Sequence, residues 1–282
     1  MIILSYIFYF IASSVSPLQR RWLATNKNQD NKGQIHFVFQ VTLIVALLSL
    51  VLPLFSRFEL VGDYSHLLIL SIVTGVVGAG FCVASYTAQK HVEAGVTSVV
   101  SNIYTPVTII LSTVFLHEKL TAIQIVGTLL LLVAIFIVSK KHHIGRFKFD
   151  KHFLLMLSSG VMLAFVLVAD RALVKITGFT AGTMLSWWST CICLGIVTIL
   201  TRNKSEYSKK DVMITGGLRF LQNLSWAILT FVVGNLSIVS SITTFKVVII
   251  FIAAALFLHE REDLPRKILG SLIAVVGLLL MK

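Results

Sequence analysis

Long apolar blocks recur along the whole chain, and they constrain its fold more than any other feature of the sequence. Residues 41–55 and 126–138 are two of these blocks. A helix that crosses a lipid bilayer needs about 20 mostly apolar residues. Charged residues make up only 13% of the chain, whereas soluble domains contain about 25%. The sequence therefore excludes an ordinary water-soluble domain and predicts an all-α integral membrane protein.

Ten segments are apolar over a length that can cross the membrane. The connections between them hold nearly all of the charged residues and are too short to form a soluble domain. We therefore predict ten transmembrane helices, at residues 2–23, 36–55, 66–88, 96–116, 122–139, 153–173, 179–200, 211–233, 238–258 and 264–281.

The formal net charge of +12 reflects how the basic residues are distributed among the connections. Of the 24 Lys and Arg residues, only Arg219 and Lys246 lie well inside a predicted span. The odd-numbered connections hold 17 of the others, and the even-numbered connections together with the C-terminus hold 5. Basic residues favour the cytoplasmic side, so this bias predicts a cell-membrane protein with cytoplasmic odd-numbered connections and both termini outside. The positive charge thus indicates orientation and not nucleic-acid binding.

The two halves of the chain carry a repeated pattern. Leu-His-Glu-Lys at 116–119 recurs as Leu-His-Glu-Arg at 258–261, and a Gly-hydroxyl-Leu triplet follows each copy, at 127–129 and 270–272. Five predicted spans precede the basic connection at 140–151 and five follow it, so the halves must have opposite orientations. The pattern predicts two inverted five-helix repeats, residues 1–141 and 142–282. In transporters with such repeats the substrate site lies near the midplane, where the halves meet.

These features resemble the EamA domains of the drug/metabolite transporter superfamily, and the resemblance covers nearly the whole chain. Its most specific residues are Glu118 and Glu260, with Gly127 and Gly270 behind them. The position before each Glu, usually Gly in the family, is His here, and family members typically have cytoplasmic termini, the reverse of the orientation that the charge bias predicts. The resemblance implies a secondary transporter that moves a small metabolite or drug by alternating access, through a site between the halves.

Lys246 is the strongest single candidate for substrate binding. It lies about ten residues from the nearest end of its span, which is roughly 15 Å along a helix. A cation at this depth is costly, so it is expected either to bind an anionic substrate or to bond to neighbouring polar groups such as Tyr104. Its position also resembles that of a lysine in the phosphosugar-carrying branch of the superfamily, although Val247 follows it where that branch has a basic residue. An anion-exchanging carrier of phosphosugars or nucleotide sugars is therefore the alternative function.

The repeat places further polar residues opposite this lysine. Tyr104 occupies the position equivalent to Lys246 at a spacing of 142, and Asn102 and Thr243 lie in the matching polar strings of the two halves. Pro106 leaves the carbonyl of Asn102 without its helical donor and can kink the span. These side chains either line a central site or hold packed helices together.

A polar stripe in the eighth span supplies the next candidates. Its members recur at helical spacing and should face protein or water: Arg219, Gln222, Asn223, Trp226 and Thr230. Tyr86 in the third span is a weaker candidate. Asp170 is the one acid within a predicted span; it is either an interfacial charge paired with Arg171 or the residue that couples transport to protons.

Other classes of protein fit the sequence less well. A membrane-embedded enzyme would need catalytic acids or a His-containing set at membrane depth, and no His lies deep in a predicted span. The sequence has no phosphate-binding loop of the ATPase type, and its three Cys residues lie within apolar blocks. We therefore expect no enzyme activity, no metal and no cofactor. The expected partners are a small-molecule substrate and membrane lipid, and a homodimer is compatible with the sequence.

Overall fold

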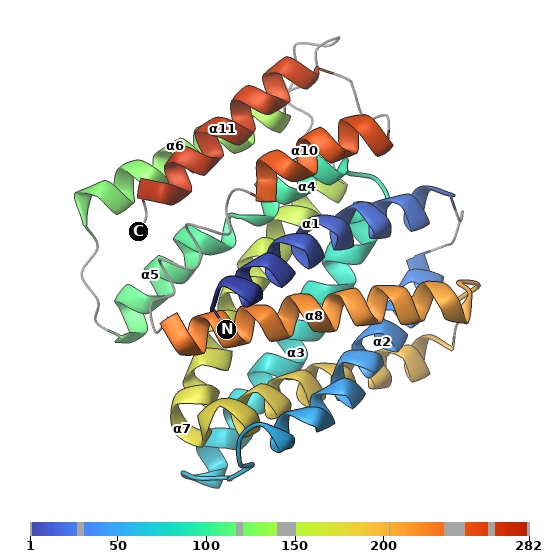
Figure 1. Ribbon diagram of the computed structural model, residues 1–282, viewed down its shortest axis with the longest axis vertical. Coiled ribbons are helices and arrows are strands. Elements are labelled where there is room, and N and C mark those ends of the chain that lie inside the picture. The colour runs from blue at the N-terminus through green and yellow to red at the C-terminus, as the bar shows by residue number, and fades with distance from the viewer. Residues whose placement is uncertain are drawn as a thin grey trace.

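The computed structural model describes residues 2–26, 31–116, 121–139, 151–202, 204–233, 246–258 and 263–280. This part of the chain is helical and contains no strand (Figure 1). The backbone of a membrane-spanning segment must satisfy its own hydrogen bonds, and a helix does so. The helices are α1 (Ile2–Asn26), α2 (Asn31–Leu48), the 3-10 helix η1 (Ser49–Leu54), α3 (Tyr64–Gln89), α4 (Ala94–Ser101), α5 (Tyr104–Leu116), α6 (Ala122–Ser139), α7 (Lys151–Thr201), α8 (Lys209–Val233), α10 (Lys246–Phe257) and α11 (Leu264–Leu280).

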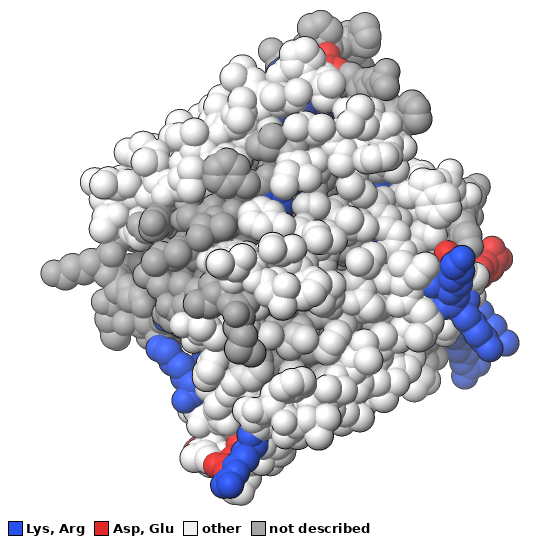
Figure 2. Space-filling model, viewed as in Figure 1, with Lys and Arg blue, Asp and Glu red and all other residues white. Residues whose placement is uncertain are grey.

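Three segments of the described chain are long and apolar enough to cross a membrane by length and composition: Gly33–Leu54, Tyr64–Gln89 and Lys151–Thr201. The prediction of an all-α fold is thus confirmed for the described residues, whereas the count of ten spans stays a prediction. Figure 2 shows basic side chains at the edges of the molecule and a broad uncharged area between them, which is the surface a membrane protein presents to lipid.

Helix α3 begins where its first turn can be capped. Oδ1 of Asp63 accepts a hydrogen bond from the backbone N–H of Ser65 at 3.2 Å, and the hydroxyl of Ser65 also donates to Oδ2. Such a cap satisfies a donor that lacks a partner inside the helix. These bonds to Ser65 hold the pKa of the Asp63 carboxyl below its usual value.

The sixth and seventh predicted spans form one element, α7, which is broken at Gly178. This glycine has φ +81°, a conformation that other residues rarely adopt. Ser186 donates a hydrogen bond to Asp170 at 2.5 Å, although 16 residues of straight helix would separate them by about 24 Å. The chain therefore folds back at Gly178, and the two arms of α7 pack together.

The fourth predicted span is also interrupted, between α4 and α5 at Asn102 and Ile103. Pro106 cannot donate to the carbonyl of Asn102, and the N–H of Thr105 donates to it instead at 3.0 Å. The side-chain amide of Asn102 donates to the carbonyl of Ser98 at 2.9 Å. The break thus lies one turn before Pro106, the residue from which the sequence predicted a kink in this span.

The helices pack in three main pairs: α3 with α7, α1 with α8, and α6 with α11. Figure 1 shows α6 and α11 side by side at one end of the molecule and α1 next to α8 across its centre. Gly277 and Gly270 of α11 lie so close to α6 that an added Cβ would come within 2.7 Å of the Gly127 carbonyl oxygen and 3.5 Å of the Ala134 carbonyl oxygen, respectively. Small residues allow membrane helices this close approach.

Two ion pairs lie at the start of α11. Lys267 is buried and bonds to Glu93, the N-cap residue of α4. Arg266 pairs with Asp263 at 3.2 Å within the first turn of α11 itself. The first pair therefore ties α11 to α4, whereas the second is local.

Candidate functional site

A cavity of about 420 Å³ lies among α2, α3, α7 and α8. Its lining includes Gly78 and Cys82 near the middle of α3 and Arg219 near the middle of α8, so it reaches the mid-depth of the helix bundle. Five aromatic rings contribute to its wall: Phe81, Phe179, Trp187, Trp226 and Phe231. Its polar and charged residues are Thr42, Asp170, Arg171, Lys175, Thr183, Ser186, Thr190, Arg219 and Asn223.

Arg219 lines the cavity from near the middle of α8. Its guanidinium lies over the ring of Phe81, 5.8 Å from the ring centroid. A cation–π contact of this kind attracts the positive charge but leaves the N–H donors of the guanidinium free to bind an anion. Arg219 has no ion-pair partner among the described residues.

Asp170 is the one carboxylate in the cavity lining, and its partner among the described residues is Ser186. The expected pairing with the adjacent Arg171 is not seen, because neighbouring residues on a helix point in different directions. Asp170 therefore lies between the two arms of α7 and faces the cavity.

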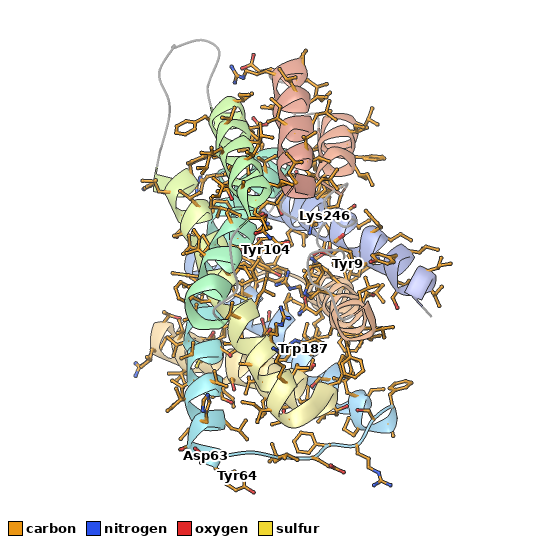
Figure 3. The ribbon with its side chains drawn as sticks, turned by 90° about the vertical axis from the view of Figure 1, so that its left-hand side faces the viewer. Tyr9, Asp63, Tyr64, Tyr104, Trp187 and Lys246 are labelled. Atoms are coloured by element: carbon orange, nitrogen blue, oxygen red, sulfur yellow. The ribbon has the colours of Figure 1, made fainter. Side chains whose placement is uncertain are left out.

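Lys246 lies behind the cavity wall. Its ammonium donates to the hydroxyl of Tyr9 at 2.9 Å and lies 5.3 Å from the centroid of that ring. The ring of Tyr9 in turn lies 5.4 Å from that of Trp226, which lines the cavity. Figure 3 shows Lys246 beside Tyr9, with Trp187 farther away. The rings of Tyr9 and Trp226 thus lie between Lys246 and the cavity.

The structure brings together some of the predicted site residues and not others. Four of them line the cavity: Asp170, Arg219, Asn223 and Trp226. Those outside the lining are Lys246, Tyr104, Asn102, Gln222 and Tyr86. Gln222 is half-buried, and its buried Oε1 has no hydrogen-bond partner among the described residues. Thr243, Glu118 and Glu260 fall outside the described residues.

A buried polar face of α1 is the main functional feature that we did not predict. Tyr9, Ser13, Ser16 and Arg20 follow one another at intervals of four, three and four residues, and all four are buried. Nε of Arg20 donates to the carbonyl of Ser16 at 3.3 Å, and its guanidinium lies 4.6 Å from the centroid of the Tyr86 ring. The helical spacing was visible in the sequence, but Arg20 lies near the end of its predicted span, where an arginine commonly reaches water.

The two ends of the bundle differ around the cavity. At one end, which we call the Gly178 end, Lys175 and Phe231 of the cavity lining are exposed. At the other, the Tyr207 end, the ring of Phe37 lies 4.2 Å from that of Tyr207 and 6.2 Å from that of Tyr86.

Polar contacts accompany this packing at the Tyr207 end. Gln34 donates to the hydroxyl of Tyr207 at 2.5 Å, and burial raises the pKa of that phenol, so it stays protonated. The guanidinium of Arg21 donates to the carbonyls of Gln89 and Lys90 at 2.9 and 2.6 Å. The Tyr207 end is therefore filled by packed side chains.

The fold and the cavity together define the class of this protein. It is a helical membrane protein with charged residues in a cavity at mid-depth. The model of the EamA-like transporter family matches residues 1–140. The chain belongs to this family, part of the drug/metabolite transporter superfamily, whose members are membrane transporters of small substrates. The family predicted from the sequence is thereby confirmed.

Solved structures extend the likeness beyond the first half of the chain. One, described as a crystal structure of a protein, aligns with 96% of this chain and 98% of its own at a TM-score of 0.56 and 12% identity. At this identity it shows a shared fold and nothing about the substrate. No curated protein matches the chain.

Proposed function

We propose that this protein is a secondary transporter that moves a small metabolite or drug by alternating access, with its substrate site in the cavity around Arg219. The observation that carries the proposal is this cavity, since it places charged and aromatic side chains at mid-depth in the helix bundle. Charged residues inside a membrane are costly and mark substrate pathways.

Reciprocal contacts between α6 and α11 support two inverted repeats, residues 1–141 and 142–282, with ten spans in all. Gly277 meets Gly127, and Gly270 meets Ala134. A shift of 143 residues converts Gly127 into Gly270 and Ala134 into Gly277, so each contact maps onto the other. This exchange is what a twofold axis between antiparallel halves would produce. The same exchange relates the α1–α8 pair to the contact between α3 and the first arm of α7, where a Cβ on Gly80 would lie 3.2 Å from the sulfur of Met162.

The contrast between the two ends supports alternating access. The cavity lining reaches exposed residues at the Gly178 end, while aromatic packing fills the Tyr207 end. We assign this arrangement to one of the two states of the transport cycle. If the charge bias sets the orientation in the cell membrane, the cavity in this state faces the outside.

Weakening the Tyr207 end tests alternating access without knowledge of the substrate. Tyr207→Ala removes the ring that packs on Phe37 and should shift the population toward the opposite state. In a background without the three native cysteines, labelling of Thr183→Cys by an impermeant maleimide from the Gly178 end should then slow about threefold. Tyr64→Ala, at an exposed residue of α3, should leave the rate unchanged. Equal or faster labelling with Tyr207→Ala would show that the two ends do not open in alternation and would contradict the proposal.

Asp170 is the residue that we propose for coupling to protons, because it is the carboxylate of the cavity and bonds to a neutral hydroxyl. A thermal-shift screen of metabolites on the purified protein identifies a substrate for the test. With that substrate in proteoliposomes, Asp170→Asn should abolish accumulation driven by a pH gradient and preserve exchange. Asp63→Asn, at an exposed carboxylate, serves as control. Intact pH-driven accumulation in Asp170→Asn would exclude this role.

A further inference from the structure

We propose that the substrate is an organic anion, whose charged group binds to Arg219 and whose apolar part lies against the aromatic wall of the cavity. This inference rests on the proposed function, since it names the substrate class of the same site. Three observations carry it: the charge inside the bundle, the position of Arg219, and the residues around it.

Among the described residues, three cations inside the bundle have no ion-pair partner. The guanidinium groups of Arg20 and Arg219 lie 4.6 and 5.8 Å from the ring centroids of Tyr86 and Phe81, and the ammonium of Lys246 donates to the hydroxyl at the edge of the Tyr9 ring. Cations removed from water need a compensating charge, and an anionic substrate would supply it.

Arg219 differs from the other two cations because it lines the cavity. Asn223 and Trp226 follow it by four and seven residues on the same face of α8, and both also line the cavity. A guanidinium can bind a carboxylate or phosphate through two parallel hydrogen bonds, and the side chain of Asn223 can donate one more. Arg20 and Lys246 lie behind Tyr86 and Tyr9 and strengthen the positive potential.

The rest of the lining describes the remainder of the substrate. Phe81, Trp187 and Trp226 offer flat apolar surface beside Arg219, and the volume of about 420 Å³ is that of a small-molecule site. Arg171 and Lys175 lie in the lining toward the Gly178 end, where positive charge raises the local concentration of anions. The charged residues of the lining are three cations, Arg171, Lys175 and Arg219, and one carboxylate, Asp170. Asp170 accepts a hydrogen bond from Ser186.

Fluorescence quenching tests the sign of the cavity charge directly, because Trp187 and Trp226 are in its wall. The two remaining tryptophans, Trp22 and Trp188, are replaced by Phe. Relative to the quenching of free tryptophan by each ion, we expect iodide to quench this protein more strongly than caesium does. Arg219→Gln should lower the iodide quenching constant about threefold relative to that of neutral acrylamide, and Arg219→Lys should restore most of it. Arg57→Gln, which removes an exposed arginine, should change neither the iodide nor the acrylamide quenching constant.

A matched series of organic probes tests the substrate class. 4-Iodobenzoate, 4-iodobenzyl alcohol and 4-iodobenzylamine share one ring and differ in charge. The anion should quench the cavity tryptophans at the lowest concentration and should lose this advantage in Arg219→Gln. Equal quenching by all three probes, or strongest quenching by the amine, would overturn the inference. These measurements need no transport, whereas the Thr183→Cys labelling needs no anion, so either proposal can fail while the other holds.

Discussion

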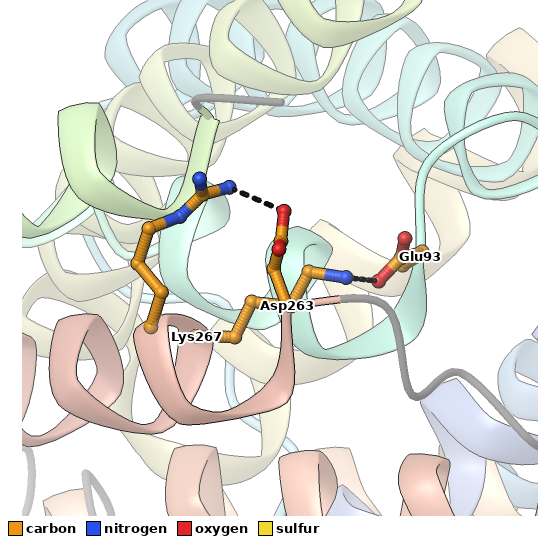
Figure 4. Close-up of polar contacts among 4 residues, drawn as sticks. Glu93, Asp263 and Lys267 are labelled. Carbon is orange, nitrogen blue, oxygen red and sulfur yellow. Dashed lines mark hydrogen bonds and ion pairs between the residues drawn. The ribbon is translucent and has the colours of Figure 1, made fainter. Parts of the chain in front are cut away.

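Glu93→Gln should lower the free energy of unfolding by about 2–3 kcal/mol, because it leaves the ammonium of Lys267 buried without its counter-charge. Lys267 is only 5% exposed, and its partner is Glu93 at the start of α4 (Figure 4). The side chain of Glu93 is 27% exposed, so the expected loss is smaller than for a fully buried pair. The measurement is the midpoint of thermal unfolding in detergent, followed by the loss of native size on gel filtration.

The second ion pair of α11 provides the matched control. Figure 4 shows Asp263 and the guanidinium it contacts next to the Glu93–Lys267 pair. Because Asp263 and Arg266 lie within one helical turn and are partly exposed, Asp263→Asn should cost less than about 1 kcal/mol. Adding Lys267→Met to Glu93→Gln should recover most of the stability, since it removes the stranded charge. Equal unfolding midpoints for Glu93→Gln and Asp263→Asn would contradict this account of the buried pair.

The sequence predicted helix positions well because hydrophobic length determines them. The predicted spans 122–139 and 211–233 correspond to α6 (Ala122–Ser139) and α8 (Lys209–Val233) in the structure. A segment must stay apolar across the bilayer and becomes polar where it leaves it, so both ends of a span are marked in the composition.

The sequence predicted the site only in part, because spacing reports which residues share a helix face and not what that face meets. The stripe of α8 placed Arg219, Asn223 and Trp226 together, and all three line the cavity. Lys246 could have faced the cavity or a neighbouring helix, and the choice depends on Tyr9, which lies 237 residues away in the sequence.

Arg20 is a second residue whose surroundings could not be predicted from the sequence. From its position near the end of a span, it could have extended to water as arginines commonly do. It is buried because α3 brings the ring of Tyr86 to 4.6 Å from its guanidinium. Tertiary packing, which local sequence does not report, thus makes an ordinary flanking residue part of the interior charge.

Gly277→Ala should destabilise the protein by about 2–3 kcal/mol, and Gly277→Val should prevent its accumulation in the folded form. A Cβ at this position would lie 2.7 Å from the carbonyl oxygen of Gly127 and 3.0 Å from the backbone nitrogen of Leu131. Backbone atoms cannot rotate away as a side chain can, so α6 and α11 would have to separate. The measurement is the yield of monodisperse protein from membranes, together with the thermal unfolding midpoint of Gly277→Ala.

Two other glycines separate this effect from the general cost of replacing glycine in a helix. Gly217→Ala in α8 should be neutral or slightly stabilising, since no atom lies within 4 Å of the added Cβ and alanine favours the helix. Gly270→Ala should have an intermediate effect, because its closest neighbours are the side chains of Val138 and Ile137, which can shift. The destabilisation should therefore increase from Gly217 to Gly270 to Gly277, because the added Cβ would meet no atom, then side chains, then backbone atoms. If Gly277→Ala proves as stable as Gly217→Ala, then α6 and α11 do not approach each other as closely as the reciprocal contacts require. Those contacts would then no longer support paired inverted repeats.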